Sequence, residues 1–146
     1  MIRKTIADFE EALAKVPGAV FGDNDMAPLK HTFADGIYIR EIFLPKGVLA
    51  TGKIHKHCHP SFLLSGDVSV ITENGGVERL KAPVSMISPA GTKRIVYAHE
   101  DSVWITVHCN PDDLRDLKQL EDLIIAKSYD ELPAAILGEI LCLSQQ

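Results

Sequence analysis

The sequence has few cysteines, few aromatic residues and no excess of basic residues. Its three cysteines are an odd number and include no CxxC pair, so neither a disulfide framework nor a zinc-knuckle spacing is indicated. Lysine and arginine total 15 against 20 aspartates and glutamates, which gives a net charge of -5. Because nucleic-acid binding depends on basic residues that neutralise phosphates, this balance argues against a nucleic-acid partner.

Long apolar runs and common catalytic loops are missing as well. No run approaches the roughly 20 apolar residues that cross a bilayer, and the chain opens without the apolar core of a signal peptide. We therefore expect a soluble, cytoplasmic protein without a membrane partner. There is no Gly-rich phosphate loop and no Ser/His/Asp nucleophile arrangement, so phosphoryl transfer and serine hydrolysis are not expected.

The chain does have 46% apolar residues in 146, enough to bury the core of one domain. Apolar spacing predicts a helix over 5–16 with Thr5 as its N-cap, followed by an irregular connection through residue 30. A second helix is predicted to begin at Asn110-Pro111, and a third covers about 130–143. The apolar stripes of these terminal helices need a surface to cover, which favours a homodimer.

The central part of the chain has a different pattern, in which short β-rich runs alternate with turn residues. Such spacing is typical of a sandwich or barrel. We expect one domain with an N-terminal helix and connection (1–30), an all-β barrel (37–109) and terminal helices (110–146). The predicted strands are 37–44, 48–59, 62–72, 77–80, 84–88, 93–98 and 103–109.

Three histidines lie in five residues of one predicted strand, at His55, His57 and His59. Side chains alternate across a strand, so these three should project from the same face and can converge on one ion. Neutral imidazole suits divalent transition metals such as Fe, Ni or Zn. The alternative is a solvated strand face on which the histidines bind nothing.

His108 is a further candidate whose orientation the pattern leaves open. Val103, Ile105 and Val107 make the more apolar face of their strand, which leaves His108 with Trp104 on the other face. If that second face lines the barrel, His108 is another metal ligand; otherwise it is a partly exposed histidine. Cys58 and Cys109 are interpreted as small buried apolar residues.

The stretch from Gly52 to Gly91 resembles the two motifs of the cupin superfamily. The first motif is present as His55-x-His57 with a strand that ends at Gly66, and the second as the turn Pro89-Ala90-Gly91. The resemblance implies a double-stranded β-helix over the central part of the chain, to which the predicted N-terminal helix and the two C-terminal helices are added. In the family the metal, where present, sits inside the barrel; here it would be a divalent Fe, Mn, Ni or Zn ion.

The chain departs from the family motifs at two ligand positions. Counting back from Gly66 reaches His59 where the family has a glutamate, and Arg94 stands where it has its last histidine. Arginine has no lone pair with which to coordinate a cation. Arg94 is interpreted either as a partner for a small anionic ligand such as a carboxylate, or as a surface residue. Glu41 is a weaker candidate for a ligand-binding carboxylate, against a surface salt bridge.

Two functions remain open at this point. In the first, a metal held by His55, His57, His59 and His108 serves binding or catalysis, with the reaction unassigned. In the second, the protein is a non-catalytic structural or accessory module, because the chain is also similar to small cupin-like proteins of phages and prophages.

Overall fold

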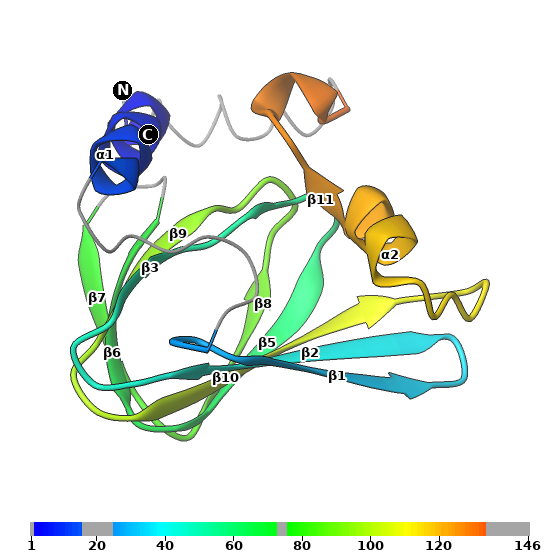
Figure 1. The fold of residues 1–146 in the computed structure, drawn as a ribbon, viewed down its shortest axis with the longest axis horizontal. Coiled ribbons are helices and arrows are strands. Elements are labelled where there is room, and N and C mark those ends of the chain that lie inside the picture. Colours follow the sequence, from blue (N-terminus) through cyan, green and yellow to red (C-terminus); the bar gives the residue numbers. More distant parts are fainter. Residues whose placement is uncertain (1, 16–24, 73–75, 134–146) are drawn as a thin grey trace.

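Two antiparallel sheets face each other and enclose the core of the protein (Figure 1). The computed structural model describes residues 2–15, 25–72 and 76–133. The larger sheet has the order β1-β2-β10-β5-β8 and the smaller one β3-β9-β6-β7. Their strands are β1 (Leu29–Ala34), β2 (Ile37–Leu44), β10 (Ser102–Cys109), β5 (His59–Ser65), β8 (Val84–Ser88), β3 (Leu49–Thr51), β9 (Arg94–Ala98), β6 (Asp67–Thr72) and β7 (Val77–Lys81).

Helices and a short ladder lie outside these sheets. Helix α1 (Ile2–Ala14) lies beside β3 and β9, where Glu10 accepts a hydrogen bond from Thr51 and pairs with Lys93. Helix α2 (Leu117–Ile124) leads directly into β11 (Ile125–Ala126), which pairs with β4 (Ile54–His55). Within the described ranges, no helix is both long enough and apolar enough to span a bilayer.

The core between the sheets is apolar. It consists of seven buried side chains, Leu44, Leu63, Val68, Val70, Leu80, Ala98 and Trp104. In a second cluster, Leu120 and Ile124 of α2 pack with Tyr38 of β2. Alternation along β10 turns Trp104 and His108 inward, so the face with Val103 and Val107 is the outer one. The apolar pattern favoured the opposite assignment.

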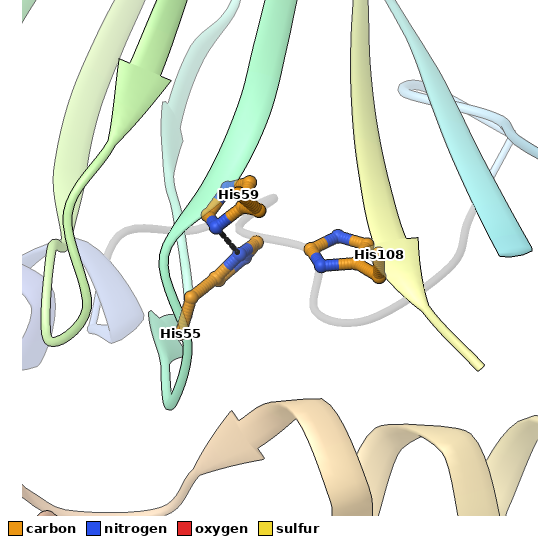
Figure 2. A group of neighbouring side chains, drawn as sticks. All are labelled: His55, His59 and His108. Atoms are coloured by element: carbon orange, nitrogen blue, oxygen red, sulfur yellow. Dashed lines mark hydrogen bonds between the residues drawn. The ribbon is translucent and has the colours of Figure 1, made fainter. Parts of the chain in front are cut away.

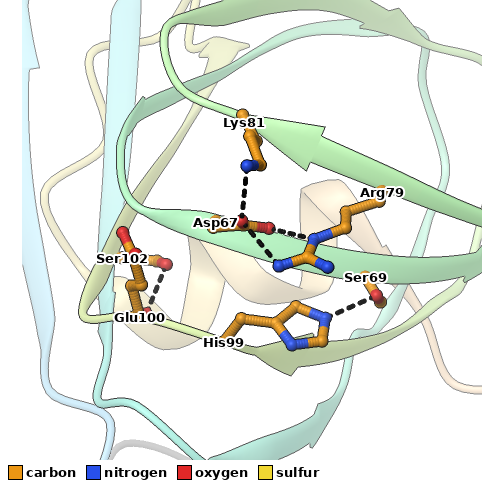
Figure 3. A network of polar contacts seen from close by, with 7 residues as sticks. All are labelled: Asp67, Ser69, Arg79, Lys81, His99, Glu100 and Ser102. Carbon is orange, nitrogen blue, oxygen red and sulfur yellow. Dashed lines mark hydrogen bonds and ion pairs between the residues drawn. The ribbon is translucent and has the colours of Figure 1, made fainter.

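The chain passes from one sheet to the other at Gly66, between β5 and β6. Gly66 has a φ of +92°, and an added Cβ would lie 2.1 Å from the Oγ of Ser102. Nearby, Arg79 donates two hydrogen bonds to the carboxylate of Asp67, at 2.8 and 2.9 Å (Figure 3). Ser102 donates from its Oγ to the carbonyl of Glu100 at 2.7 Å. Only a residue without a side chain fits this corner.

Strand β1 lies where the sequence predicts an irregular connection followed by an unassigned segment. It forms a hairpin with β2 in which Leu29 lies opposite Ile42 and Ala34 opposite Ile37. Asp35-Gly36 makes the turn, with Gly36 at a φ of +69°. An Asp-Gly pair is a strong hairpin signal that the flanking pattern obscured. The N-terminal helix is confirmed, but it begins at Ile2, so Thr5 is not its N-cap.

Two predicted strands are interrupted. The run 48–59 is divided into β3, β4 and the start of β5, since the chain leaves β9 after Thr51 and turns at 56–58. The run 62–72 is divided at Gly66. Residues on either side of such breaks no longer share one alternating face, because alternation holds only within a continuous strand.

The C-terminal segment also differs from expectation. Helix α2 begins at Leu117 and not at Pro111; its N-cap is Asp116, which accepts a hydrogen bond from the Gln119 amide at 2.8 Å. Asn110 instead closes a turn through two hydrogen bonds to the backbone of Leu114. The predicted helix 130–143 lies mostly outside the described residues, and the homodimer stays a prediction.

Candidate metal centre

Three histidines from three strands converge near the ends of those strands (Figure 2). His55 ends β4, His59 begins β5 and His108 lies near the end of β10. All three are buried, and their candidate ligand atoms lie within 4.8 Å of one another. The ring centroids are 4.2 Å apart for His55 and His59, 4.7 Å for His59 and His108, and 5.1 Å for His55 and His108.

The hydrogen bonds of His59 leave one ring nitrogen unused. Its Nδ1 lies 3.0 Å from the carbonyl oxygen of His57, which can only accept, so Nδ1 carries the proton. Its Nε2 therefore carries a lone pair instead of a proton. This nitrogen is buried without a hydrogen-bond partner among the described residues. Leaving a buried polar atom unpaired costs about 1 to 3 kcal/mol. A metal ion is one partner that removes this cost.

Burial keeps the histidines neutral. It lowers the pKa of His55 to about 2, with smaller contributions from the nearby His59 and His108. Burial likewise lowers the pKa of His108 to about 3 and lowers that of His59. Three neutral imidazoles are ligands that zinc, iron and nickel accept, and the donor set fits such an ion.

Two arginines share the interior with the histidines. Arg94 lies on the same face of β9 as Val96 and the core residue Ala98, and its guanidinium carbon is 5.9 Å from the ring centroid of Trp104. Arg40 lies on the face of β2 that carries Tyr38 and Leu44. The charges of both arginines contribute to the lowered pKa of His55. Burial also lowers the pKa of Arg94.

The aromatic ring of Tyr38 packs against the ring of His108. Tyr38 stacks on His108 with a centroid separation of 5.9 Å, and its hydroxyl lies 2.7 Å from Nδ1 of His31. The Nε2 of His108 lies 2.9 Å from the hydroxyl of Thr106. Contacts of this kind fix the orientation of a ligand ring.

The α2–β11 segment holds His55 in place. Ile125 lies opposite His55 in the β4–β11 ladder, and the next amide, that of Lys56, donates to the carbonyl of Ile124 at 2.7 Å. On its other side the carbonyl of His55 accepts from the amide of Gly91 at 2.7 Å. An ion pair between Lys53 and Glu121 adds a further contact between the two segments.

A cavity of about 340 Å³ lies next to the cluster. His108 belongs both to the cluster and to the wall of this cavity. The wall also includes His57, Cys58, Cys109, Leu123 and Ile124. A small molecule in this cavity would therefore lie beside one of the three histidines.

The structure brings together His55, His59 and His108 and leaves two other candidates out. His57 is exposed, because residues 56–58 form a turn and not a strand. Glu41 lies on the outer face of β2 with its carboxylate 3.8 Å from Nζ of Lys30. Cys58 and Cys109 are exposed, so their interpretation as buried residues is wrong.

Sequence reasoning did not single out Arg40 or Tyr38. The signal that could have found them is the alternation along 37–44, where Tyr38, Arg40, Ile42 and Leu44 share one face. Glu41 was selected from the other face because the apolar residues Ile39 and Phe43 flank it there.

Comparison with known proteins gives a fold and no closer relationship. No family model matches the chain, and no curated protein sequence matches it. Among solved structures, an uncharacterized conserved protein with a double-stranded β-helix domain from Klebsiella pneumoniae has a TM-score of 0.52 at 17% identity, covering 65% of this chain and 86% of that one. A cupin superfamily protein from Desulfitobacterium hafniense has a TM-score of 0.50 at 9% identity, covering 62% and 83%.

A larger enzyme is also similar. Salicylate 1,2-dioxygenase from Pseudoaminobacter salicylatoxidans, in a structure of its adducts with gentisate, has a TM-score of 0.55 at 11% identity. The match covers 82% of this chain and 34% of the enzyme. At such identities the likeness concerns the fold alone, which is the cupin-type double-stranded β-helix. The predicted all-β cupin core is confirmed.

Proposed function

We propose that the protein binds one divalent transition metal ion through His55, His59 and His108, and that a small anionic molecule binds beside the metal. The buried lone pair of His59 Nε2 is the observation that carries the proposal, since it has no hydrogen-bond partner in the described part of the chain. A metal held by three protein ligands keeps positions open and acts as a Lewis acid towards a bound ligand. The reaction stays unassigned.

The anionic ligand is proposed from the two arginines. A carboxylate can contact a metal with one oxygen and a guanidinium with the other, which relieves the repulsion between the two cations. Arg94 has no hydrogen bond or ion pair with any residue in the described ranges that would already occupy its guanidinium. The likeness in fold to a dioxygenase that binds gentisate supports the choice of carboxylates as probes.

Metal loading tests the first part. Protein purified without an affinity tag and incubated with Zn(II), Fe(II), Mn(II) or Ni(II) should hold about one ion per chain by elemental analysis. Metal at a hundredfold excess over Kd should stabilise the fold by about 2.7 kcal/mol, measured as a rise in Tm. Fewer than about 0.1 ion per chain with every metal would reject the proposal and leave the non-catalytic module as the better description.

Replacing Arg94 tests the second part. Salicylate, gentisate and acetate should raise the Tm of the metal-loaded protein, and Arg94→Ala should weaken the best of them by about tenfold or more, because a charge-assisted hydrogen bond is lost. Arg94→Lys should recover part of the effect, since lysine keeps the charge but not the bidentate geometry. Arg115→Ala is the control, as Arg115 is exposed and stacks on Phe33 outside the cluster. Equal shifts in all variants would remove the proposed role.

A further inference from the structure

Two cysteines lie at the wall of the cavity beside the histidine cluster. Cys58 and Cys109 are both exposed, neither is in a disulfide, and both line the same cavity of about 340 Å³. They are separated by 51 positions in the sequence (109 minus 58) and come from different segments, the turn before β5 and the end of β10. The pairing of the strands explains why two cysteines that are distant in the sequence line the same cavity.

Strands β5 and β10 form an antiparallel pair that ends close to both cysteines. In this antiparallel pair Trp104 lies opposite Leu63, Ile105 opposite Phe62 and Thr106 opposite Ser61. The paired residues end at Thr106 and Ser61. Continuing the register by two steps brings His108 towards His59, and the ring centroids of these two histidines are 4.7 Å apart. One further step brings Cys109 towards Cys58, which lies just before β5. Residues directly opposite in an antiparallel pair have Cα atoms about 4.5 to 5.5 Å apart.

Both thiols are also accessible. His59 and His108 are buried, whereas their sequence neighbours Cys58 and Cys109 are exposed. A disulfide needs Cα atoms about 4.4 to 6.8 Å apart with Cβ atoms that face each other. A position of Cys58 across from Cys109 in the wall of the shared cavity would satisfy both needs.

We propose that Cys58 and Cys109 form a redox-active dithiol that a low-molecular-weight disulfide, such as oxidised glutathione, converts into an intramolecular disulfide. One thiolate attacks a sulfur of oxidised glutathione, the glutathione S–S bond breaks, and one reduced glutathione leaves with a proton. The second thiolate attacks the protein sulfur of the mixed disulfide and releases a second reduced glutathione. Two cysteines are oxidised and one glutathione disulfide is reduced.

The proposed disulfide between Cys58 and Cys109 would lie next to the histidine cluster. It joins the residue before His59 to the residue after His108, and it lies in the wall of the cavity through which a ligand would reach His108. Oxidation thereby restrains two of the three histidines and changes the access to them. The inference needs no metal and is independent of the proposed function.

Intact-mass analysis of the metal-free protein tests the proposal. In a Cys142→Ser background, incubation with oxidised glutathione should give a monomer lighter by two hydrogens that retains no glutathione and regains both thiols with dithiothreitol. After trypsin digestion without reductant, peptides 57–79 and 95–115 should be found joined. The same peptide map on the unsubstituted chain serves if the Cys142→Ser protein does not fold.

Single replacements are the matched controls. Cys58→Ser and Cys109→Ser, each in the Cys142→Ser background, should keep one glutathione per chain because the second thiol is missing. A double-glutathionylated protein, a disulfide-linked dimer as the main product, or two unreacted thiols would each overturn the proposal. Metal content of the reduced protein is measured separately, so this failure is distinguishable from failure of the metal site.

Discussion

Replacing His59 with alanine is expected to abolish metal binding without destabilising the metal-free protein. The variant removes one of the three proposed ligands, and we expect metal affinity to fall by at least about 100-fold, more than the loss of an outer contact costs. It also removes the buried Nε2 that has no partner among the described residues. The lost packing is offset by relief of about 1 to 3 kcal/mol of desolvation cost.

The metal affinity and the stability of the metal-free protein should therefore change independently of each other. Titration with Zn(II) should show no rise in Tm for His59→Ala, whereas urea unfolding of the metal-free variant should give a free energy of unfolding close to that of the wild type. His57→Ala is the control, because His57 is only two residues away yet exposed and outside the cluster. Loss of metal from His57→Ala to the same degree as from His59→Ala would show that the assigned ligands are wrong.

Gly66→Ala is expected to have the largest effect on stability. Gly66 has a φ of +92°, and a Cβ there would lie 2.1 Å from Ser102 Oγ and 2.6 Å from the carbonyl oxygen of Asp101. The second contact is with backbone, so relief requires the backbone at Asp101, just before β10, to move away from Gly66. We expect a loss of more than about 3 kcal/mol, a large part of the 5 to 15 kcal/mol of a typical domain.

Gly36→Ala separates backbone strain from the steric clash. Gly36 has a comparable φ of +69°, but an added Cβ would meet nothing within 4 Å. Only the cost of the left-handed conformation applies, about 1 to 2 kcal/mol. Urea unfolding of both variants should place Gly66→Ala well below Gly36→Ala, and similar losses would mean that the corner adjusts more easily than the distances indicate.

Much of the fold could be predicted from the sequence because strand patterns and turn residues are local. The interruption of 48–59 could not, because it depends on pairing with β11, which lies about 70 residues later. Strand β1 was hidden because its alternation of Leu29, His31 and Phe33 includes a polar residue on the inward face.

The candidate site, too, could be predicted only in part, because some of its residues are brought together by long-range pairing. His55 and His59 could be selected from their density in the sequence, but the choice between His57 and His108 depended on two long-range facts. The turn at 56–58 turns His57 outward, and the inward face of β10 is the one that carries Trp104 and not the β-branched residues. Neither fact follows from local spacing. The pairing of β5 with β10, once known, explains why His59 and His108 lie close together.

The β4–β11 ladder has a consequence for the order of events during synthesis. Chains fold from the N-terminus as they are made, yet His55 is held by Ile125, a residue translated about 70 positions later. The ring of His55 therefore has its final position only after helix α2 and the strand that follows it have left the ribosome. The three-histidine cluster is therefore assembled only after the residues up to Ala126 have been made.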